Sequence, residues 1–192
     1  MILQYDVIIM RCCTGVISWV VLDNNMATGR QNKLVGQTGE YLVASELSRR
    51  GLIATTFTGN VPHYDIIAST DNGKHISVQV KTISGLNWQF ARVDQFVKIN
   101  FKGHAQIVGK CLPSPVENLI FVFVKLDNYG SDKFYICTWP ELTDIISRHH
   151  SEYLAKHNGV RPKRWDSLHI AIAVSHISHF DNRWELIEKL LK

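Results

Sequence analysis

Cysteine is scarce in this sequence, and its four copies form no disulfide or zinc-binding pattern. They stand at Cys12, Cys13, Cys111 and Cys137. None belongs to a CxxC pair, and no secretory signal accompanies them. Because disulfides persist mainly in oxidising compartments, we expect reduced thiols in a cytoplasmic protein.

Several motifs with known chemistry are missing as well. The sequence has no GxxxxGKS or GxxxxGKT segment, which argues against an NTP-driven motor in this chain. It also has no HExxH, and HISH at residues 176–179 has no thiol partner at ligand spacing. We therefore expect no metal site among the C-terminal histidines.

A long hydrophobic run is absent too. The most apolar stretch, residues 7–22, is broken by Arg11 and is shorter than the roughly 20 apolar residues of a membrane span. Residues 1–6 contain none of the basic residues that precede a signal-peptide core. We expect no membrane span. We expect residues 1–30 to add little to the fold, and translation could start at Met26 instead of Met1. The alternative is that this segment forms an extra edge strand of the sheet.

The composition of the chain is that of a globular protein. Of its 192 residues, 45% are hydrophobic and 20% are charged, and there is no repeat or low-complexity stretch. We predict a single domain over residues 31–192 with a C-terminal helical part. The net charge of +4 is compatible with a polyanionic partner but is common in proteins without one.

Residues 36–51 have the pattern of a helix with a polar residue on its buried face. Gly51 suits the position after the last helical turn. Val43 and Leu47 form an apolar stripe at helical spacing, and Glu40 falls on the same stripe. A carboxylate that faces inward is costly unless a cation meets it. Glu40 therefore needs an explanation.

Alternating or continuously apolar segments predict five strands, which are residues 52–57, 64–70, 75–82, 118–126 and 133–139. The fourth is almost entirely apolar, which is typical of a central strand. Residues 140–158 are predicted to be a helix with Pro140 in its first turn, and Asp181 is predicted to cap a C-terminal helix. This order of elements predicts an α/β fold with a mixed central β-sheet flanked by helices.

Polar side chains alternate with apolar ones in ISVQVKT, residues 76–82. Val78 and Val80 point to one face of the predicted strand, whereas Gln79 and Lys81 point to the other. A wet outer face would account for this pattern. The alternative is that Gln79 and Lys81 belong to an active site.

The turn before this strand decides which face Asp65 shares. A two-residue Asn-Gly loop would place Asp65 opposite Val80, on the face away from Gln79. A three-residue loop over residues 71–73, with Gly73 in the left-handed region, would place Asp65 opposite Gln79. An active site at these residues therefore requires the three-residue loop.

The unexplained polar residues are Glu40, Asp65, Gln79 and Lys81. In this order they resemble the PD-(D/E)xK nuclease superfamily. The nearest pattern is its QxK branch, seen in Mrr-like restriction endonucleases and an intron-encoded homing endonuclease, and archaeal Holliday junction resolvases share the fold. GxxGE at residues 36–40 and VQVKT at 78–82 carry the likeness, which covers roughly residues 34–100. It implies a restriction-endonuclease-like core.

The resemblance also implies a Mg²⁺- or Mn²⁺-dependent endonuclease that hydrolyses phosphodiester bonds of DNA. Asp65 would bind the metal directly, Gln79 would offer its amide oxygen and Val80 its backbone carbonyl. Glu40 would hold a water at the metal. Lys81 would stabilise the developing negative charge or orient that water.

Two features depart from the family pattern. Gln79 replaces the usual acid, which makes the site less negative and weakens its affinity for metal. Pro62 lies three residues before Asp65 instead of next to it. The alternative function is therefore a catalytically inactive protein of the same fold that binds nucleic acid or a protein partner.

RPKRW, residues 161–165, is a second candidate for contact with nucleic acid. Arg161, Lys163 and Arg164 suit phosphate groups, and the tryptophan beside them suits a stacked base, although such clusters are more often solvated loops. DNA is the expected partner and RNA the alternative. A homodimer is expected if both strands of a duplex are cut, since one site cuts one strand at a time.

Overall fold

The computed structural model describes residues 29–57, 59 and 61–192, so the expectations for residues 7–22 and for Met26 lie outside the described residues. Helix α1, Gly29–Arg49, opens the described part. It begins earlier than residue 36 because the polar segment before that position is also compatible with a helix. It ends as predicted at Gly51, whose φ is 81°.

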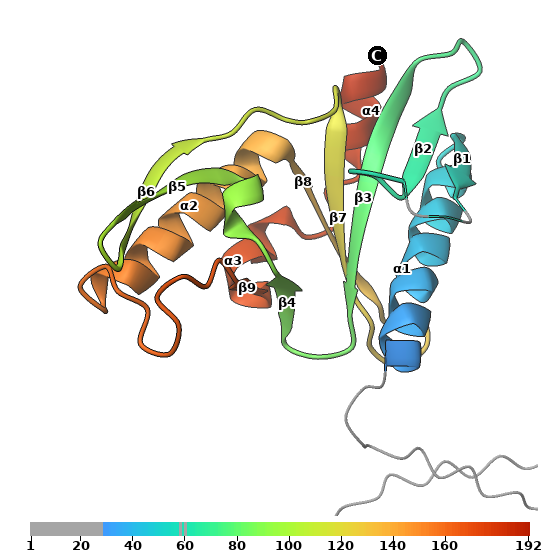
Figure 1. The fold of residues 1–192 in the computed structure, drawn as a ribbon. Coiled ribbons are helices and arrows are strands. Elements are labelled where there is room, and N and C mark those ends of the chain that lie inside the picture. Colours follow the sequence, from blue (N-terminus) through green and yellow to red (C-terminus); the bar gives the residue numbers. More distant parts are fainter. Residues whose placement is uncertain (1–28, 58, 60) are drawn as a thin grey trace, which may run out of the picture.

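A five-stranded sheet forms the centre of the molecule, in the order β1-β2-β3-β7-β8 (Figure 1). Its strands are β1 Ile53–Thr56, β2 Ile66–Ser69, β3 His75–Ile83, β7 Leu119–Lys125 and β8 Lys133–Thr138. β3 and β7 are parallel, and the other neighbours are antiparallel. The predicted fold class, an α/β fold with a mixed central sheet flanked by helices, is confirmed.

Each face of the sheet packs against its own set of helices. On one face, Val78 and Val80 of β3 are buried with Val43 and Leu47 of α1 and with helix α4, Glu185–Leu191. On the other face, the aromatic side chains of β7 pack against helix α2, Trp139–Ala155. The two faces of β3 therefore face different hydrophobic clusters.

The segment between β3 and β7 forms two small sheets that sequence patterns did not predict. β4 (Asn87–Phe90) pairs with β9 (Ile170–Ala173), and β5 (Val97–Lys102) pairs with β6 (Ala105–Cys111). A short 3-10 turn, η1 at Val93–Gln95, lies between β4 and β5. Figure 1 shows β5 and β6 alongside α2, at the opposite end of the molecule from α1.

Both predicted C-terminal helices exist, and only the last one starts at a position that differs from expectation. α2 begins with a capping box in which Thr138 and Glu141 bond each other's backbone N–H groups, and Pro140 stands in its first turn. The prediction that Asp181 caps the last helix is wrong. Asp181 instead forms a bridge with Tyr135 of β8, after the short elements α3 (Val174–Ile177) and η2 (Ser178–Phe180). α4 starts later because this bridge holds the chain extended at Asp181.

The turn between β2 and β3 is the three-residue loop that an active site requires. The Thr70 N–H donates to the Lys74 carbonyl at 2.9 Å, and Gly73 has a φ of 84°. Ile66 pairs with Val78 in the resulting register.

Among the described helices, none has both the length and the apolar character to cross a membrane.

Candidate functional site

Asp65 is fastened to β3 by both its backbone and its side chain. It is half-buried just before β2, and its N–H donates to the Val78 carbonyl at 2.8 Å. Its Oδ2 accepts a hydrogen bond from the Val80 N–H at 2.7 Å and another from the Gln79 amide nitrogen. The register of the hairpin therefore brings Asp65 and Gln79 into direct contact, as the three-residue loop predicts.

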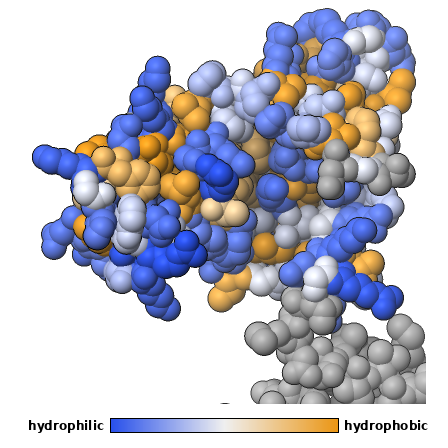
Figure 2. Space-filling model, in the orientation of Figure 1, coloured by the Kyte–Doolittle hydropathy of each residue, from blue (hydrophilic) through white to orange (hydrophobic). Residues whose placement is uncertain are grey.

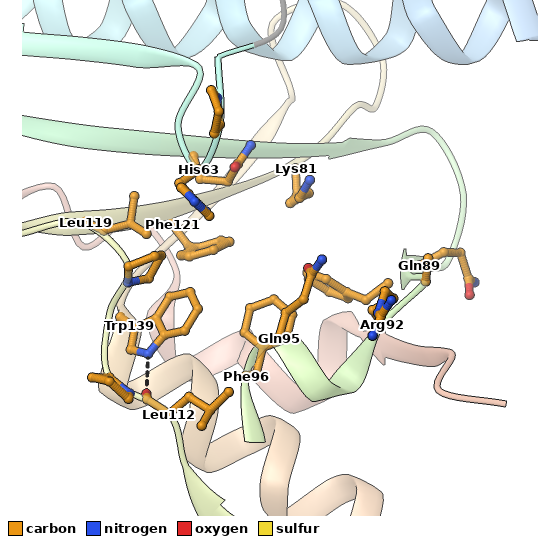
Figure 3. Close-up of a pocket in the computed structure, with 16 residues that line it drawn as sticks. His63, Lys81, Gln89, Arg92, Gln95, Phe96, Leu112, Leu119, Phe121 and Trp139 are labelled. Carbon is orange, nitrogen blue, oxygen red and sulfur yellow. Dashed lines mark hydrogen bonds between the residues drawn. The ribbon is translucent and has the colours of Figure 1, made fainter. Parts of the chain in front are cut away.

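Gln79 and Lys81 line a cleft of about 1010 Å³ on the face of β3 opposite α1. Figure 3 shows His63 and Lys81 along one side of this cleft, with Gln95 and Arg92 across from them. Aromatic side chains of the core form its floor, which makes the cleft apolar at the base and polar at the rim. Such a cleft suits a ligand that carries both charged and flat apolar groups.

The backbone of β3 also fixes the wall of this cleft. The Lys81 carbonyl accepts a hydrogen bond from the indole N–H of Trp88 at 2.8 Å. Trp88 is buried on β4, so this bond ties β4 to the strand that carries Lys81. The residues from β4 to η1 therefore stand at a fixed place across from Lys81.

Glu40 approaches from α1 because the helix packs very closely on β3. A Cβ added at Gly39 would lie 1.8 Å from the Oγ1 atom of Thr82. Only glycine allows this approach, whereas Gly36 has open space around it. Glu40 and Asp65 then line one hollow of about 490 Å³ beside α1.

Glu40, Asp65 and Lys81 interact electrostatically. Partial burial raises the pKa of Glu40, the charge of Asp65 raises it further, and Lys81 lowers it. Burial likewise raises the pKa of Asp65, against the hydrogen bonds from Val80 and Gln79 and the charge of Lys81. Two carboxylates thus repel each other beside a single lysine, and their negative charge is only partly compensated.

The donor set fits a hard divalent cation better than a zinc ion. Among the residues that the structure describes, no three His, Cys, Asp or Glu side chains gather as a metal site. Glu40, Asp65 and the Gln79 amide offer oxygen atoms, and Mg²⁺ uses one or two carboxylates with waters in its remaining positions. A cation there would also relieve the repulsion between the two carboxylates.

The predicted residues fall into two groups in space. Glu40, Asp65, Gln79, Val80 and Lys81 meet where α1, β2 and β3 converge, with Asp65 facing one hollow and Lys81 the other. Arg161, Lys163 and Arg164 lie outside this meeting point, in the loop after α2.

Sequence patterns missed two residues at the larger cleft, which are His63 and Gln95. His63 has a φ of 74°, an uncommon conformation for a residue with a side chain. Neither residue belongs to a motif, because the turns that bring them to the cleft depend on packing against distant strands.

Comparison with known proteins yields a weak structural likeness. No protein-family model matches the chain, and no curated protein matches its sequence. The chain is similar to the solved structure of a bacterial homing endonuclease, with 13% identity and a TM-score of 0.44. The likeness covers 82% of this chain and 93% of that one. It is too weak to support a conclusion about function.

Proposed function

We propose that this protein is a metal-dependent endonuclease that hydrolyses phosphodiester bonds of DNA, as a member of the QxK branch of the PD-(D/E)xK superfamily. The observation that carries the proposal is the contact of Asp65 with Gln79 and the Val80 N–H, beside Glu40 and Lys81. A solvated strand face would need none of these contacts. RNA is the alternative substrate.

Each residue has a role that its surroundings support. Asp65 and Gln79 would hold Mg²⁺ or Mn²⁺, with the Val80 carbonyl as a further donor, and the bound cation would polarise the phosphate and acidify water. Gln79 now presents its amide nitrogen to Asp65, so its amide must turn over to offer oxygen instead. Lys81 neutralises charge that develops on the phosphate.

Glu40 orients the attacking water from the α1 side. Its carboxylate lines the same hollow as Asp65. Burial and the negative charge of Asp65 raise the pKa of Glu40, which makes it a better proton acceptor. Lys81 stands on the other side of the strand pair, in the larger cleft. Water held by Glu40 and phosphate beside Lys81 would therefore meet at a cation that Asp65 holds.

An inactive nucleic-acid-binding or interaction protein of the same fold is the second candidate. The observation that favours it is the hydrogen bond between Gln79 and Asp65, which satisfies both groups without a cation. Such a protein would bind its partner equally well with and without metal. Cytoplasmic location and a homodimer for duplex cleavage are further parts of the proposal.

Nicking of supercoiled plasmid by the purified protein with Mg²⁺ or Mn²⁺ tests the proposal. Asp65→Ala and Lys81→Ala should each reduce cleavage by roughly 100-fold or more, since each removes a group at the reacting phosphate. EDTA should abolish it. The matched controls are Asp71→Ala and Lys133→Ala, which remove the same charges at exposed positions outside the site.

The mutant pattern separates the two candidates. Loss of metal-dependent nicking in both site variants, with both controls active, supports the nuclease. Nicking that survives in Asp65→Ala and Lys81→Ala comes from a contaminant. Binding of DNA without any nicking, and unchanged by EDTA, favours the inactive protein.

A further inference from the structure

Two segments that are far apart in the sequence pack together at the end of the molecule away from α1 (Figure 1). We call residues 97–111 and 156–169 the basic lobe. It contains seven of the 21 Lys and Arg residues but one of the 17 Asp and Glu residues. The lobe thus carries a charge of +6 and the rest of the chain −2, for the total of +4. A polyanion is the partner that this distribution favours.

The loop in this lobe is not a freely solvated one, because a buried amide holds it. Gln106 of β6 is only 4% exposed. Its amide nitrogen donates to the Trp165 carbonyl at 2.6 Å and to the Ser167 carbonyl at 3.0 Å. Its amide oxygen lies 3.0 Å from Nε2 of the buried His150 on α2. The side chain of Trp165 is therefore presented from a fixed backbone.

Aromatic rings gather around Trp165 on the surface. The ring of His104 stacks on the indole with centroids 4.6 Å apart and 20° between the planes. Phe101 meets the indole edge-on at 5.8 Å. Trp165 is nevertheless 42% exposed and Phe101 44% exposed, so this cluster stays open to a further ring. Figure 2 shows hydrophobic residues interleaved with hydrophilic ones at this end of the molecule.

A basic hollow adjoins the aromatic cluster. Its volume is about 460 Å³, and its lining includes Arg161, Lys163 and Arg164 together with His157 and His169, but no carboxylate. In the described part of the chain, neither Arg161 nor Lys163 has an ion-pair partner; Arg164 has Asp166 at 3.4 Å. Unpaired cations beside an exposed aromatic ring suit a phosphate next to a base.

We propose that the basic lobe binds a nucleic-acid strand with an unpaired base, which stacks on Trp165 while its phosphates lie in the adjoining hollow. An unpaired base is required because bases in a duplex already stack on one another and hide their flat faces. Binding at the lobe is separate from hydrolysis, and it goes beyond the proposed reaction because it requires neither metal nor Asp65.

Fluorescence anisotropy of the whole chain in EDTA tests this inference. The two probes are a labelled oligo(dT) of about 12 nucleotides, near the length that one stacking domain covers, and an abasic deoxyribose-phosphate strand of equal length and charge. Trp165→Ala should weaken oligo(dT) binding about 5-fold or more. It should change binding of the abasic strand by less than about 2-fold, since that strand has no base to stack.

Three further proteins sharpen the test. Trp165→Phe keeps an aromatic face and should retain most of the affinity for oligo(dT). A Lys163→Ala/Arg164→Ala double variant should weaken binding of both strands and reduce the salt slope by roughly 0.7 for each phosphate that is no longer neutralised. Tyr129→Ala removes a fully exposed ring outside the lobe and should bind both strands like the wild type.

The outcomes separate this inference from the proposed nuclease. Three results would each overturn the proposed binding. Trp165→Ala could lose affinity equally for both strands, or it could bind oligo(dT) as well as the wild type does. The third such result is that the wild type binds neither strand. If the protein binds oligo(dT) in a base-dependent way but never nicks plasmid, the proposed binding at the basic lobe is supported and the proposed DNA nuclease is contradicted. If nicking requires Asp65 but binding does not depend on bases, the proposed nuclease is supported and the proposed binding at the basic lobe is contradicted.

Discussion

The candidate site and the basic lobe bring functional side chains together in different ways. The site residues lie within residues 40–81, on one helix and one hairpin, and hydrogen bonds between neighbouring strands hold them. The lobe joins residues 97–111 to residues 156–169 through one buried amide, Gln106. Local register thus determines the site, whereas long-range packing determines the lobe. The two regions should therefore respond differently to mutation and pH.

The largest effect on stability is expected where α1 meets β3. Gly39→Ala would place a methyl group 1.8 Å from Oγ1 of Thr82, and moving the helix away should cost about 1–3 kcal/mol of unfolding free energy. Glu40 would move with the helix, so plasmid nicking should fall as well. Urea denaturation measures the first effect.

Gly36→Ala is the matched control on the same helix. Nothing lies within 4 Å of the added Cβ, so alanine should stabilise the protein by roughly 0.5–1 kcal/mol through its better helix propensity. Equal effects of the two substitutions would contradict the close approach of α1. If Thr82→Ala restores part of the stability that Gly39→Ala loses, the close approach of α1 is supported, because Thr82→Ala removes the methyl and hydroxyl groups of Thr82 that the added Cβ would meet.

The protein should lose stability in mild acid because of His150, the α2 residue that contacts Gln106 of the basic lobe. Burial, together with the charges of Arg161 and His149, lowers the pKa of His150 to about 4. Between pH 6.5 and about 4 the unfolded imidazole binds a proton that the folded one does not, so stability falls as the pH falls through this range. The loss should reach about 2 kcal/mol at pH 5.

Comparison with His150→Gln isolates this effect. Glutamine can still donate to the Gln106 amide oxygen but does not titrate. Urea denaturation at pH 7.5 and pH 5 should show a loss of stability about 2 kcal/mol larger for the wild type than for the variant. Parallel losses in the two proteins would show that His150 is not the source of acid sensitivity.

The smallest effect is expected at the turn that sets the hairpin register. Gly73 has a φ of 84°, and Gly73→Ala should cost about 1 kcal/mol because alanine is strained there. Gly85→Ala, which has open space and no positive φ, should stay within about 0.5 kcal/mol of the wild type. Plasmid nicking should survive Gly73→Ala, since burial of Ile76 and Val78 holds the register.

Much of the sheet could be predicted from side-chain alternation. Gln79 and Lys81 stand on one face of β3 and Val78 on the other, as period-two alternation requires. Turn chemistry left a two-residue and a three-residue loop open before β3, and the structure has the three-residue loop, which puts Asp65 opposite Gln79. The roles of these residues stay predictions, because their arrangement does not by itself demonstrate catalysis.

Asp181 shows where local patterns fail. An acidic residue before an amphipathic segment favours an N-cap, yet the chain at Asp181 pairs with Tyr135 of β8 and the helix starts later. The competing bridge joins residues 46 positions apart, and no local pattern reports such a contact. The pairing of β4 with β9 was missed for the same reason.

The sequence by itself determined the elements of the central sheet and the face of β3 that carries Gln79 and Lys81, because strand alternation acts over a few residues. It left two turns open before β3, and the folded hairpin decided the register and with it the contact of Asp65 with Gln79. Only the tertiary structure decided how closely α1 approaches Thr82, which residues face Lys81 across the cleft, and that Gln106 holds the loop of Trp165. Those contacts depend on the packing of segments distant in the chain, where shape and burial decide the outcome.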